Sequence, residues 1–578
     1  MGTRGIAGSL LAATALAAGA LAAPAAAEPA GFSVRSYMVP VTQPDELGRP
    51  VSLDTDVYLP AGRPPRRGWP LIEIFHGGGS DKSNPYDTGY AKEFASHGYA
   101  SLIYSARGHG DSGGQTTVIG PKEIRDLYDV TAWALGIGGR DAPPHPSFHI
   151  DRRRIGLAGY SQGGLHTNLA QAYMGSPRLN PYGIRFAAFA PGNTPDYTFR
   201  ALAPHGVIKL SVGVGLLETY LVGTSARVSP LIAKWVAQLA PDQPVLWGGR
   251  LCDTSPHDTP ASPVRNDLAV RSPGCFSGRL RGPVEWSQSF DDAVFPPDMA
   301  IHELRRLSNP ADRLYLTMGG HAAPAAPASA EADKLHAELR FFRLELKGRG
   351  RALPPVTYWT RDPAVAVPEG AYAYPEGSWA KHTAPTWPPP GTRRARWELG
   401  ADGRAVGSGA KPGSLPLAPL ASDVTDDPVV SAAMSATPIG TSPVPSALPR
   451  LSAPGLVAGF ATAPFRSERE LDGQPRIRIP WTPLSPDTQL VLMVYDRAPD
   501  GALTLLSRGV LGIRGAEPGT ERVVRVAGNA MSAAIHPGHS LVAMIAASSP
   551  SFYLPYAPSL GGVAAAGPGA SLSVPLGR

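Results

Sequence analysis

Cysteine is scarce in this chain of 578 residues, which contains only Cys252 and Cys275. There is no CxxC motif and no tight His/Cys cluster, so we expect neither thiol to be a nucleophile or a metal ligand. Blocks of like charge are also lacking, because the net charge of +6 is spread thinly. Nucleic acid is therefore not an expected partner. Glycine and proline are plentiful, at 65 and 63 residues, which predicts a loop-rich chain with a large β component.

Beyond the N-terminus, no run of residues is apolar enough to span a bilayer, so we expect no stable membrane insertion. The N-terminus has one basic residue, an Ala/Leu-rich run and Ala25–Ala27 before Glu28. This pattern is typical of a secretory signal peptide, residues 1–27, cleaved after Ala27; an uncleaved anchor is the alternative. The mature protein is expected to be secreted and soluble. In an oxidising compartment Cys252 and Cys275 are expected to pair, with two separate buried thiols as the alternative.

The chain divides into regions of different pattern. In residues 28–348, short apolar strands alternate with helical stretches, which predicts a doubly wound α/β sheet covered on both faces. Residues 197–282 break this rhythm and are expected to form a helical cap inserted between two strands. Residues 349–578 lose helical periodicity and are expected to form an all-β domain, a β-sandwich or jelly roll.

The stretch RIGLAGYSQGGLHTNL places Ser161 between Gly159 and Gly163, where a buried strand meets a helix. Glycines at these two positions remove side chains that would clash in so sharp a turn. The Gly-x-Ser-x-Gly pattern is typical of a nucleophile elbow. A plain strand-to-helix turn is the structural alternative.

A serine nucleophile needs a base and a carboxylate, which follow it as acid and then histidine in doubly wound hydrolases. The stretch PVEWSQSFDDAVFPP places Asp291 and Asp292 after one predicted strand, and the spacing to Pro296 favours Asp292. The stretch RLYLTMGGH places His321 after the next strand. All would lie at the carboxyl ends of parallel strands. The predicted triad is Ser161, Asp292 and His321.

A developing oxyanion also needs hydrogen-bond donors. One is expected to be the backbone N–H of Gln162, at the start of the elbow helix. The strand ending IEIFHGGGS suggests the second, because Gly77 and Gly78 lie in an HGGG-type loop whose backbone can approach a substrate.

Several stretches together resemble the CocE/NonD and X-prolyl dipeptidyl-peptidase (S15-type) serine hydrolases, which include cocaine-esterase-like enzymes and α-amino acid ester hydrolases. They are SNPYDTGYAKEFASHGYASLIYSARGHGDSGG, GYSQGG, FDDAVFPP, GGHAA, SWAKHTAPTWPPPGT, VYDRAPDGALTLLSRGVL and IHPGHSLVAMIAASSPSF. The resemblance implies an α/β-hydrolase domain with an inserted cap and a C-terminal jelly-roll domain. It places nucleophile, acid and base on Ser161, Asp292 and His321.

The chain departs from this family at two places. The family uses a tyrosine hydroxyl from an Asn-Pro-Tyr-like segment as an oxyanion donor, which falls here on Tyr86. The residues HGGGSDKS separate Tyr86 from the strand, so either Tyr86 or the glycine loop can supply the second donor. Ser105 stands where an aspartate usually precedes Arg-Gly, and we interpret that aspartate as structural.

The substrate is less well specified. In the α-amino acid ester hydrolases, acidic residues follow the triad aspartate by two and three positions, whereas here those residues are Val294 and Phe295. This argues against recognition of a free α-ammonium group, which needs a carboxylate partner when buried. The cap acids Asp196 and Glu218 are the remaining candidates for that role, and each is more commonly an ordinary solvated charge.

The cap is otherwise apolar, and its aromatic residues favour a hydrophobic acyl group, unless they are plain core. These residues are Tyr197, Phe199, Tyr220 and Trp235. The predicted triad needs no metal or organic cofactor. His536 and His539 in IHPGHS suggest a metal pair only weakly, because no third ligand is in view. The oligomeric state cannot be read from the sequence.

We therefore expect a secreted serine hydrolase that cleaves ester or amide bonds of small ester, amide or peptide substrates through an acyl-enzyme. An X-Pro dipeptidyl-peptidase is the alternative enzyme. The alternative outside enzymes is a surface- or carbohydrate-binding protein with a degenerate hydrolase domain.

Overall fold

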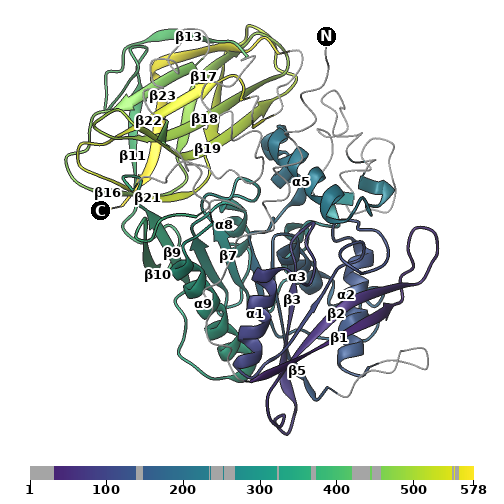
Figure 1. Cartoon of the computed structure of the whole chain (residues 1–578). Helices are drawn as coiled ribbons and strands as arrows, with labels where there is room; N and C mark the ends of the chain where they lie inside the picture. Colours follow the sequence, from purple (N-terminus) through teal and green to yellow (C-terminus); the bar gives the residue numbers. More distant parts are fainter. Residues whose placement is uncertain are drawn as a thin grey trace, which may run out of the picture.

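The structure is a computed structural model with a helix-covered sheet and a β-rich region (Figure 1). It describes residues 31–137, 148–232, 235, 252, 267–321, 325–365, 373–419, 443–444, 457–549, 552–553 and 559–577. The predicted signal peptide, residues 1–27, lies outside the described residues. None of the described helices combines the length and the hydropathy needed to cross a membrane.

The helix-covered part is built on one mixed sheet. Its strands are β1 (Phe32–Val41), β2 (Val51–Pro60), β3 (Trp69–Phe75), β4 (Ala100–Tyr104), β5 (Ile150–Tyr160), β6 (Ala188–Gly192), β7 (Glu285–Ser289), β8 (Arg313–Thr317), β9 (Val356–Arg361) and β10 (Trp379–Ala384). Their spatial order is β1-β2-β4-β3-β5-β6-β7-β8-β9-β10. The strands from β4 to β9 run parallel, so their carboxyl ends meet at one edge.

Helices cover both faces of this sheet. They are α1 (Pro85–Ser96), α2 (Pro121–Ala134), α3 (Gln162–Tyr173), α8 (Asp298–Leu304) and α9 (Ala328–Lys347). Side chains alternate along each strand, so Ile72 and Ile74 pack in one cluster with α1 and α9. Leu71 and Phe75 pack on the opposite face, with α2 and α3. The predicted α/β class is confirmed.

The inserted segment between β6 and β7 contains α-helices and 3₁₀ segments in its described part. Its elements are α4 (Thr198–Leu202), the 3₁₀ turn η1 (Pro204–Gly206), α5 (Leu210–Gly223) and the 3₁₀ segment η3 (Pro273–Arg279). Cys252 and Cys275 are joined, with Cα atoms 5.2 Å apart, a separation usual for a disulfide. Much of the cap predicted at 197–282 lies outside the described residues, including 236–251 and 253–266.

The C-terminal region is all β, as predicted, and its strands are mainly antiparallel. They are β11 (Arg393–Leu399), β12 (Arg404–Val406), β13 (Gly413–Leu417), β14 (Pro443–Val444), β15 (Val457–Thr462), β16 (Arg469–Gly473), β17 (Arg476–Pro483), β18 (Thr488–Arg497), β19 (Leu503–Ile513), β20 (Arg522–Ala527), β21 (Met531–Ile535), β22 (Ser540–Ala546) and β23 (Gly562–Leu576). Neighbours such as β18, β19 and β22 form extended ladders.

The boundary expected at residue 348 does not coincide with the end of the central sheet. Strand β9 pairs in parallel with β8, and β10 pairs with β9, so the sheet continues to Ala384. The sequence could not reveal this, because a strand of the central sheet and a strand of the all-β region have the same local pattern.

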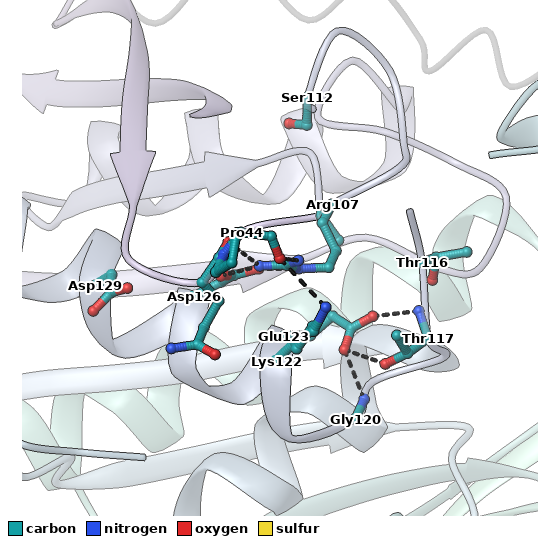
Figure 2. A network of polar contacts seen from close by, with 12 residues as sticks. Pro44, Arg107, Ser112, Thr116, Thr117, Gly120, Lys122, Glu123, Asp126 and Asp129 are labelled. Carbon is teal, nitrogen blue, oxygen red and sulfur yellow. Dashed lines mark hydrogen bonds and ion pairs between the residues drawn. The ribbon is translucent and has the colours of Figure 1, made fainter. Parts of the chain in front are cut away.

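A buried polar network fixes the segment between β4 and α2 (Figure 2). Arg107 donates from Nε and Nη2 to both carboxylate oxygens of Asp126 at 2.7 Å each, and both side chains are almost fully buried. Glu123 accepts from the backbone N–H and the hydroxyl of Thr117 at 2.5 Å each. Charge-assisted bidentate pairs are strong and directional, so Arg107 is fixed against α2.

Candidate active site

The turn between β5 and α3 has the geometry of a nucleophile elbow. Ser161 has φ 59° and ψ −119°, a conformation that non-glycine residues adopt only under strain. A Cβ on Gly163 would stand 1.9 Å from the carbonyl oxygen of Phe75, and one on Gly159 2.5 Å from the carbonyl carbon of Gly163. The Ser161 N–H donates to the Gly192 carbonyl at 2.8 Å. Both flanking positions therefore require glycine.

The structure brings the predicted triad residues into one hydrogen-bonded chain. Ser161 Oγ lies 2.9 Å from His321 Nε2, and His321 Nδ1 lies 2.9 Å from Asp292 Oδ2. Ser161 comes from the elbow, while Asp292 and His321 follow β7 and β8 at the same sheet edge. A histidine bonded to a carboxylate through Nδ1–H presents Nε2 as an acceptor for the serine proton.

The two neighbouring aspartates have different partners. Asp292 is fully buried, and its Oδ1 accepts the backbone N–H groups of Val294 and Phe295 at 2.8 Å each. Asp291 Oδ2 instead accepts the hydroxyl of Tyr374 at 2.6 Å, and burial raises the pKa of Asp291 to about 6. Asp292 is therefore the carboxylate that orients the histidine.

Two residues that the sequence analysis did not single out hold the backbone of His321. The hydroxyl of Tyr160 donates to the His321 carbonyl at 3.1 Å, and Asn193 Nδ2 donates to the Tyr160 hydroxyl at 2.7 Å. Tyr160 could have been noticed as the neighbour of the nucleophile. Nothing in the sequence marks Asn193, whose position depends on the packing of β6 against β7.

The glycine loop after β3 passes beside the nucleophile. A Cβ on Gly77 would lie 3.8 Å from the Cβ of Ser161. His76 Nε2 accepts the Ala106 N–H at 2.8 Å, so Nδ1 carries the proton and donates to the Gly77 carbonyl at 2.7 Å. Burial, together with His109, lowers the pKa of His76 to about 3. The neutral imidazole thus fixes the carbonyl of Gly77.

Tyr86 does not have the arrangement expected for an oxyanion donor. Tyr86 lies on α1, and its ring centroid is 5.7 Å from that of Tyr160. Its hydroxyl donates to the Tyr90 hydroxyl at 3.1 Å. Lys334 Nζ donates to the same oxygen at 2.7 Å. Because its proton is already donated to Tyr90, the glycine loop is the better source of the second oxyanion donor.

Gln162 and Gly78 are held together by a cap residue, Tyr220 of α5. The Tyr220 hydroxyl donates to the side-chain Oε1 of Gln162, and a Cβ on Gly78 would stand 2.8 Å from this hydroxyl. Gln162 begins α3, so its N–H has no partner within the helix. Within the described part of the chain, the N–H groups of Gly77, Gly78 and Gln162 donate to no other backbone group.

Lys209, the residue before α5, binds the loop that carries Asp292. Lys209 is buried, and its Nζ donates to the carbonyls of Ala293 and Val294 at 3.0 Å each. Burial lowers the pKa of Lys209 to about 7, although the nearby Asp292 carboxylate opposes that shift. The cap therefore contacts both the glycine loop and the loop of residues 291–295 after β7, called the acid loop below.

Asp196, one of the cap acids considered for binding an ammonium group, already has an arginine and a histidine as partners. Arg200 and His302 Nδ1 contact its Oδ2, the latter at 2.9 Å, and the carboxylate is fully buried. Among the described residues, Asp196, His302 and Glu303 are close enough to share a metal ion. However, Arg306 lies 3.6 Å from Glu303, so these guanidinium groups balance the charge that a cation would need.

The remaining cap candidates are also accounted for. Glu218 is exposed on α5. Phe199 and Trp235 pack together in a small hydrophobic cluster of the cap, and the Tyr197 hydroxyl donates to the Gly274 carbonyl at 3.0 Å. These aromatic rings act as core, and among the aromatic residues singled out Tyr220 is the one that reaches the glycine loop.

The histidines of IHPGHS have carboxylate partners in the described structure. His536 Nε2 lies 2.7 Å from Asp362 Oδ1, and His539 Nδ1 lies 2.7 Å from Asp496 Oδ2. They thus link the C-terminal region to itself and to the end of β9.

Fold and site together define a hydrolase of the α/β class. A family model of the X-Pro dipeptidyl-peptidase (S15 family) matches residues 48–190, and one of the X-Pro dipeptidyl-peptidase C-terminal non-catalytic domain matches residues 349–561. The chain belongs to the S15 family of CocE/NonD-type hydrolases, which confirms the resemblance noted from the sequence. The C-terminal match begins at 349, before β9, although β9 and β10 continue the central sheet.

Solved structures show the same fold over nearly the whole chain. A CocE/NonD family hydrolase from Staphylococcus aureus has a TM-score of 0.65 at 13% identity, covering 94% of this chain and 97% of that one. An α-amino acid ester hydrolase has 0.61 at 14%, covering 95% and 98%. An aminopeptidase from a marine sediment Thaumarchaeota archaeon has 0.59 at 15%, covering 94% of each. No curated protein matches the chain in sequence.

The elbow geometry predicts that Gly163→Ala is damaging. The new Cβ would overlap the Phe75 carbonyl, so the turn must open, at a cost of about 1–3 kcal/mol in the free energy of unfolding. Thermal unfolding and turnover of a p-nitrophenyl ester should both show the loss. Gly175→Ala is the matched control, because nothing lies within 4 Å of its Cβ position. Wild-type melting and turnover in Gly163→Ala would contradict this reading of the turn.

The contact between Tyr220 and Gln162 predicts a kinetic effect. Tyr220→Phe leaves the buried Oε1 of Gln162 without its donor, which costs about 1–3 kcal/mol in stability. We expect this loss to loosen the contact between Gln162 and the glycine loop. We expect kcat to fall about tenfold while KM stays near the wild-type value. Tyr173→Phe is the control, since that hydroxyl donates to the Val270 carbonyl at 2.9 Å, away from the triad. A raised KM at unchanged kcat would show that Tyr220 acts on substrate binding instead.

Proposed function

We propose that the protein is a secreted serine hydrolase that cleaves ester or amide bonds through an acyl-enzyme, with Ser161, His321 and Asp292 as its catalytic residues. The observation that carries this proposal is the continuous chain of hydrogen bonds from Ser161 Oγ to Asp292, at 2.9 Å in each step. This geometry speaks against a degenerate hydrolase domain, because proton transfer needs such contacts.

The proposed reaction has two halves. His321 Nε2 takes the Ser161 proton as Oγ attacks the substrate carbonyl, and Asp292 stabilises the resulting imidazolium. The tetrahedral oxyanion is bound by the N–H of Gln162 and those of the glycine loop, worth about 3 kcal/mol for each donor. Collapse releases the alcohol or amine, which takes the proton from His321. Water then loses a proton to His321, attacks the acyl-enzyme and restores Ser161.

An ester with a hydrophobic acyl group is the proposed substrate class. The apolar Val294 and Phe295, which follow Asp292 in the same loop, support this preference. The Phe295 ring lies edge-on to His321, with ring centroids 5.2 Å apart. A free α-ammonium group would need a carboxylate partner. Asp196 is neutralised by Arg200, and Glu218 points to solvent. An X-Pro dipeptidyl-peptidase remains the alternative, supported by the family itself.

Substrate assays with purified mature protein test this proposal. We expect turnover of p-nitrophenyl acyl esters and little release from Gly-Pro or Ala-Pro p-nitroanilides. Ser161→Ala should lower ester turnover by about 10⁴-fold or more, because the triad acts as a unit.

Other results of these assays would change the assignment. Serine-dependent release from the anilides, lost when the amine is blocked, would establish the dipeptidyl-peptidase. Ester turnover that survives in Ser161→Ala would refute the proposed nucleophile.

We also propose export with cleavage after Ala27. The Ala/Leu-rich N-terminal run that ends in Ala25–Ala27 supports this. The chain should be recovered from the culture medium, and N-terminal sequencing should begin at Glu28. Recovery of the intact N-terminus in the membrane fraction would show an uncleaved anchor instead.

A further inference from the structure

A basic cavity lies at the end of α9 remote from the triad. It has a volume of about 400 Å³ and is lined by Arg340, Arg343, Lys347 and Arg349, with His97 and Tyr99 from the turn between α1 and β4. Figure 1 shows α9 and α1 side by side along the sheet. Lys334, which contacts Tyr86 near the elbow, lies 13 residues before Lys347, or about 20 Å along the helix axis. The cavity is thus separate from the catalytic site.

The cavity gathers several cationic side chains. No residue that lines it carries a carboxyl group. Within the described part of the chain, Arg340, Arg343 and Arg349 form no ion pair. Lys347 Nζ donates to the carbonyl of His97 at 2.8 Å, and lies 3.6 Å from the centroid of the Tyr99 ring. Several positive charges are therefore gathered around one concave surface. The carboxylates near them are those of Glu93, 3.4 Å from His97 Nδ1, and of Asp333 and Glu285, whose pKa values the charge of Arg340 lowers against the effect of burial.

The environment of Lys347 reflects this excess of positive charge. Burial, reinforced by the charges of Arg154, Arg343 and Arg349, lowers the pKa of Lys347 to about 8. An anion bound among these groups would offset the repulsion between Lys347 and the arginines, and would raise the pKa of Lys347.

A second observation points to a missing ligand. Tyr99 is 2% exposed, lines the cavity, and its hydroxyl has no hydrogen-bond partner among the described residues. An unsatisfied buried hydroxyl is costly, and native structures contain few of them. Tyr99 thus brings an unpartnered hydroxyl to the wall of the cavity.

We propose that the cavity binds a small phosphate- or sulfate-bearing molecule. Guanidinium groups bind tetrahedral oxyanions through paired N–H donors, and Arg343 and Arg340 lie one helical turn apart on α9. The volume is in the range of small-molecule sites and exceeds what one inorganic ion fills, so a diphosphate or a phosphate or sulfate ester fits better. The proposal is independent of the proposed hydrolase activity.

Calorimetric titration of the full mature chain with inorganic pyrophosphate tests the proposal, at pH 7 and low salt. We expect saturable binding with one site per chain. Arg343→Gln should weaken it at least tenfold, and Tyr99→Phe should weaken it measurably while keeping the ring under Lys347. Arg525→Gln is the matched control, because it removes the same charge from an exposed position of β20. Melting temperatures of all variants verify folding.

Titrations with inorganic sulfate and with glucose 6-phosphate separate a free oxyanion from an ester as the preferred form. Two outcomes would overturn the proposal. The first is the absence of saturable binding up to about 10 mM pyrophosphate, a concentration about 10⁴ times the dissociation constant of a micromolar site. The second is an equal loss of affinity in Arg343→Gln and Arg525→Gln, which would mark a general electrostatic surface.

Discussion

The contact between Gly163 and the carbonyl of Phe75 is the constraint on which the candidate site depends. It holds the first turn of α3 against the end of β3, with Ser161 at φ 59° between them. The same approach places residue 163 beside the start of the glycine loop, since its Cβ position is also 3.1 Å from the His76 carbonyl oxygen. The proposed nucleophile and the proposed oxyanion donors therefore flank one close backbone approach, and a side chain of any size at residue 163 disturbs it.

Helix α5 of the cap contacts two parts of the candidate site that the sheet positions. Lys209 and Tyr220 stand at the two ends of α5, one on the carbonyls of the acid loop and the other on Gln162. Loops at the carboxyl ends of parallel strands have few fixed partners of their own, so a helix that contacts two of them reduces their freedom. The cap thereby fixes the loop that carries Asp292 and the side chain of Gln162 relative to one another.

The sequence was sufficient for those parts of the site that have a local pattern or a fixed chain order. Ser161 is marked by its glycines, and Asp292 and His321 by the strands that precede them. Tyr86 was different, because its motif gives no information on which neighbour takes its proton, and here that neighbour is Tyr90. Asp196 likewise looked like a free carboxylate until α4 and α8 supplied Arg200 and His302. The partner of a polar side chain is a property of packing, which one-dimensional patterns do not encode.

Ser105 shows how the fold tolerates its departure from the family pattern. Arg107 finds its carboxylate in Asp126 of α2, through two bonds of 2.7 Å, so the Arg-Gly segment needs no acid two residues earlier to satisfy the guanidinium. Ser105 Oγ accepts the N–H of Lys82 at 3.1 Å. This hydroxyl thus ties the segment after β4 to the loop between β3 and α1, which also contains Gly77 and Gly78.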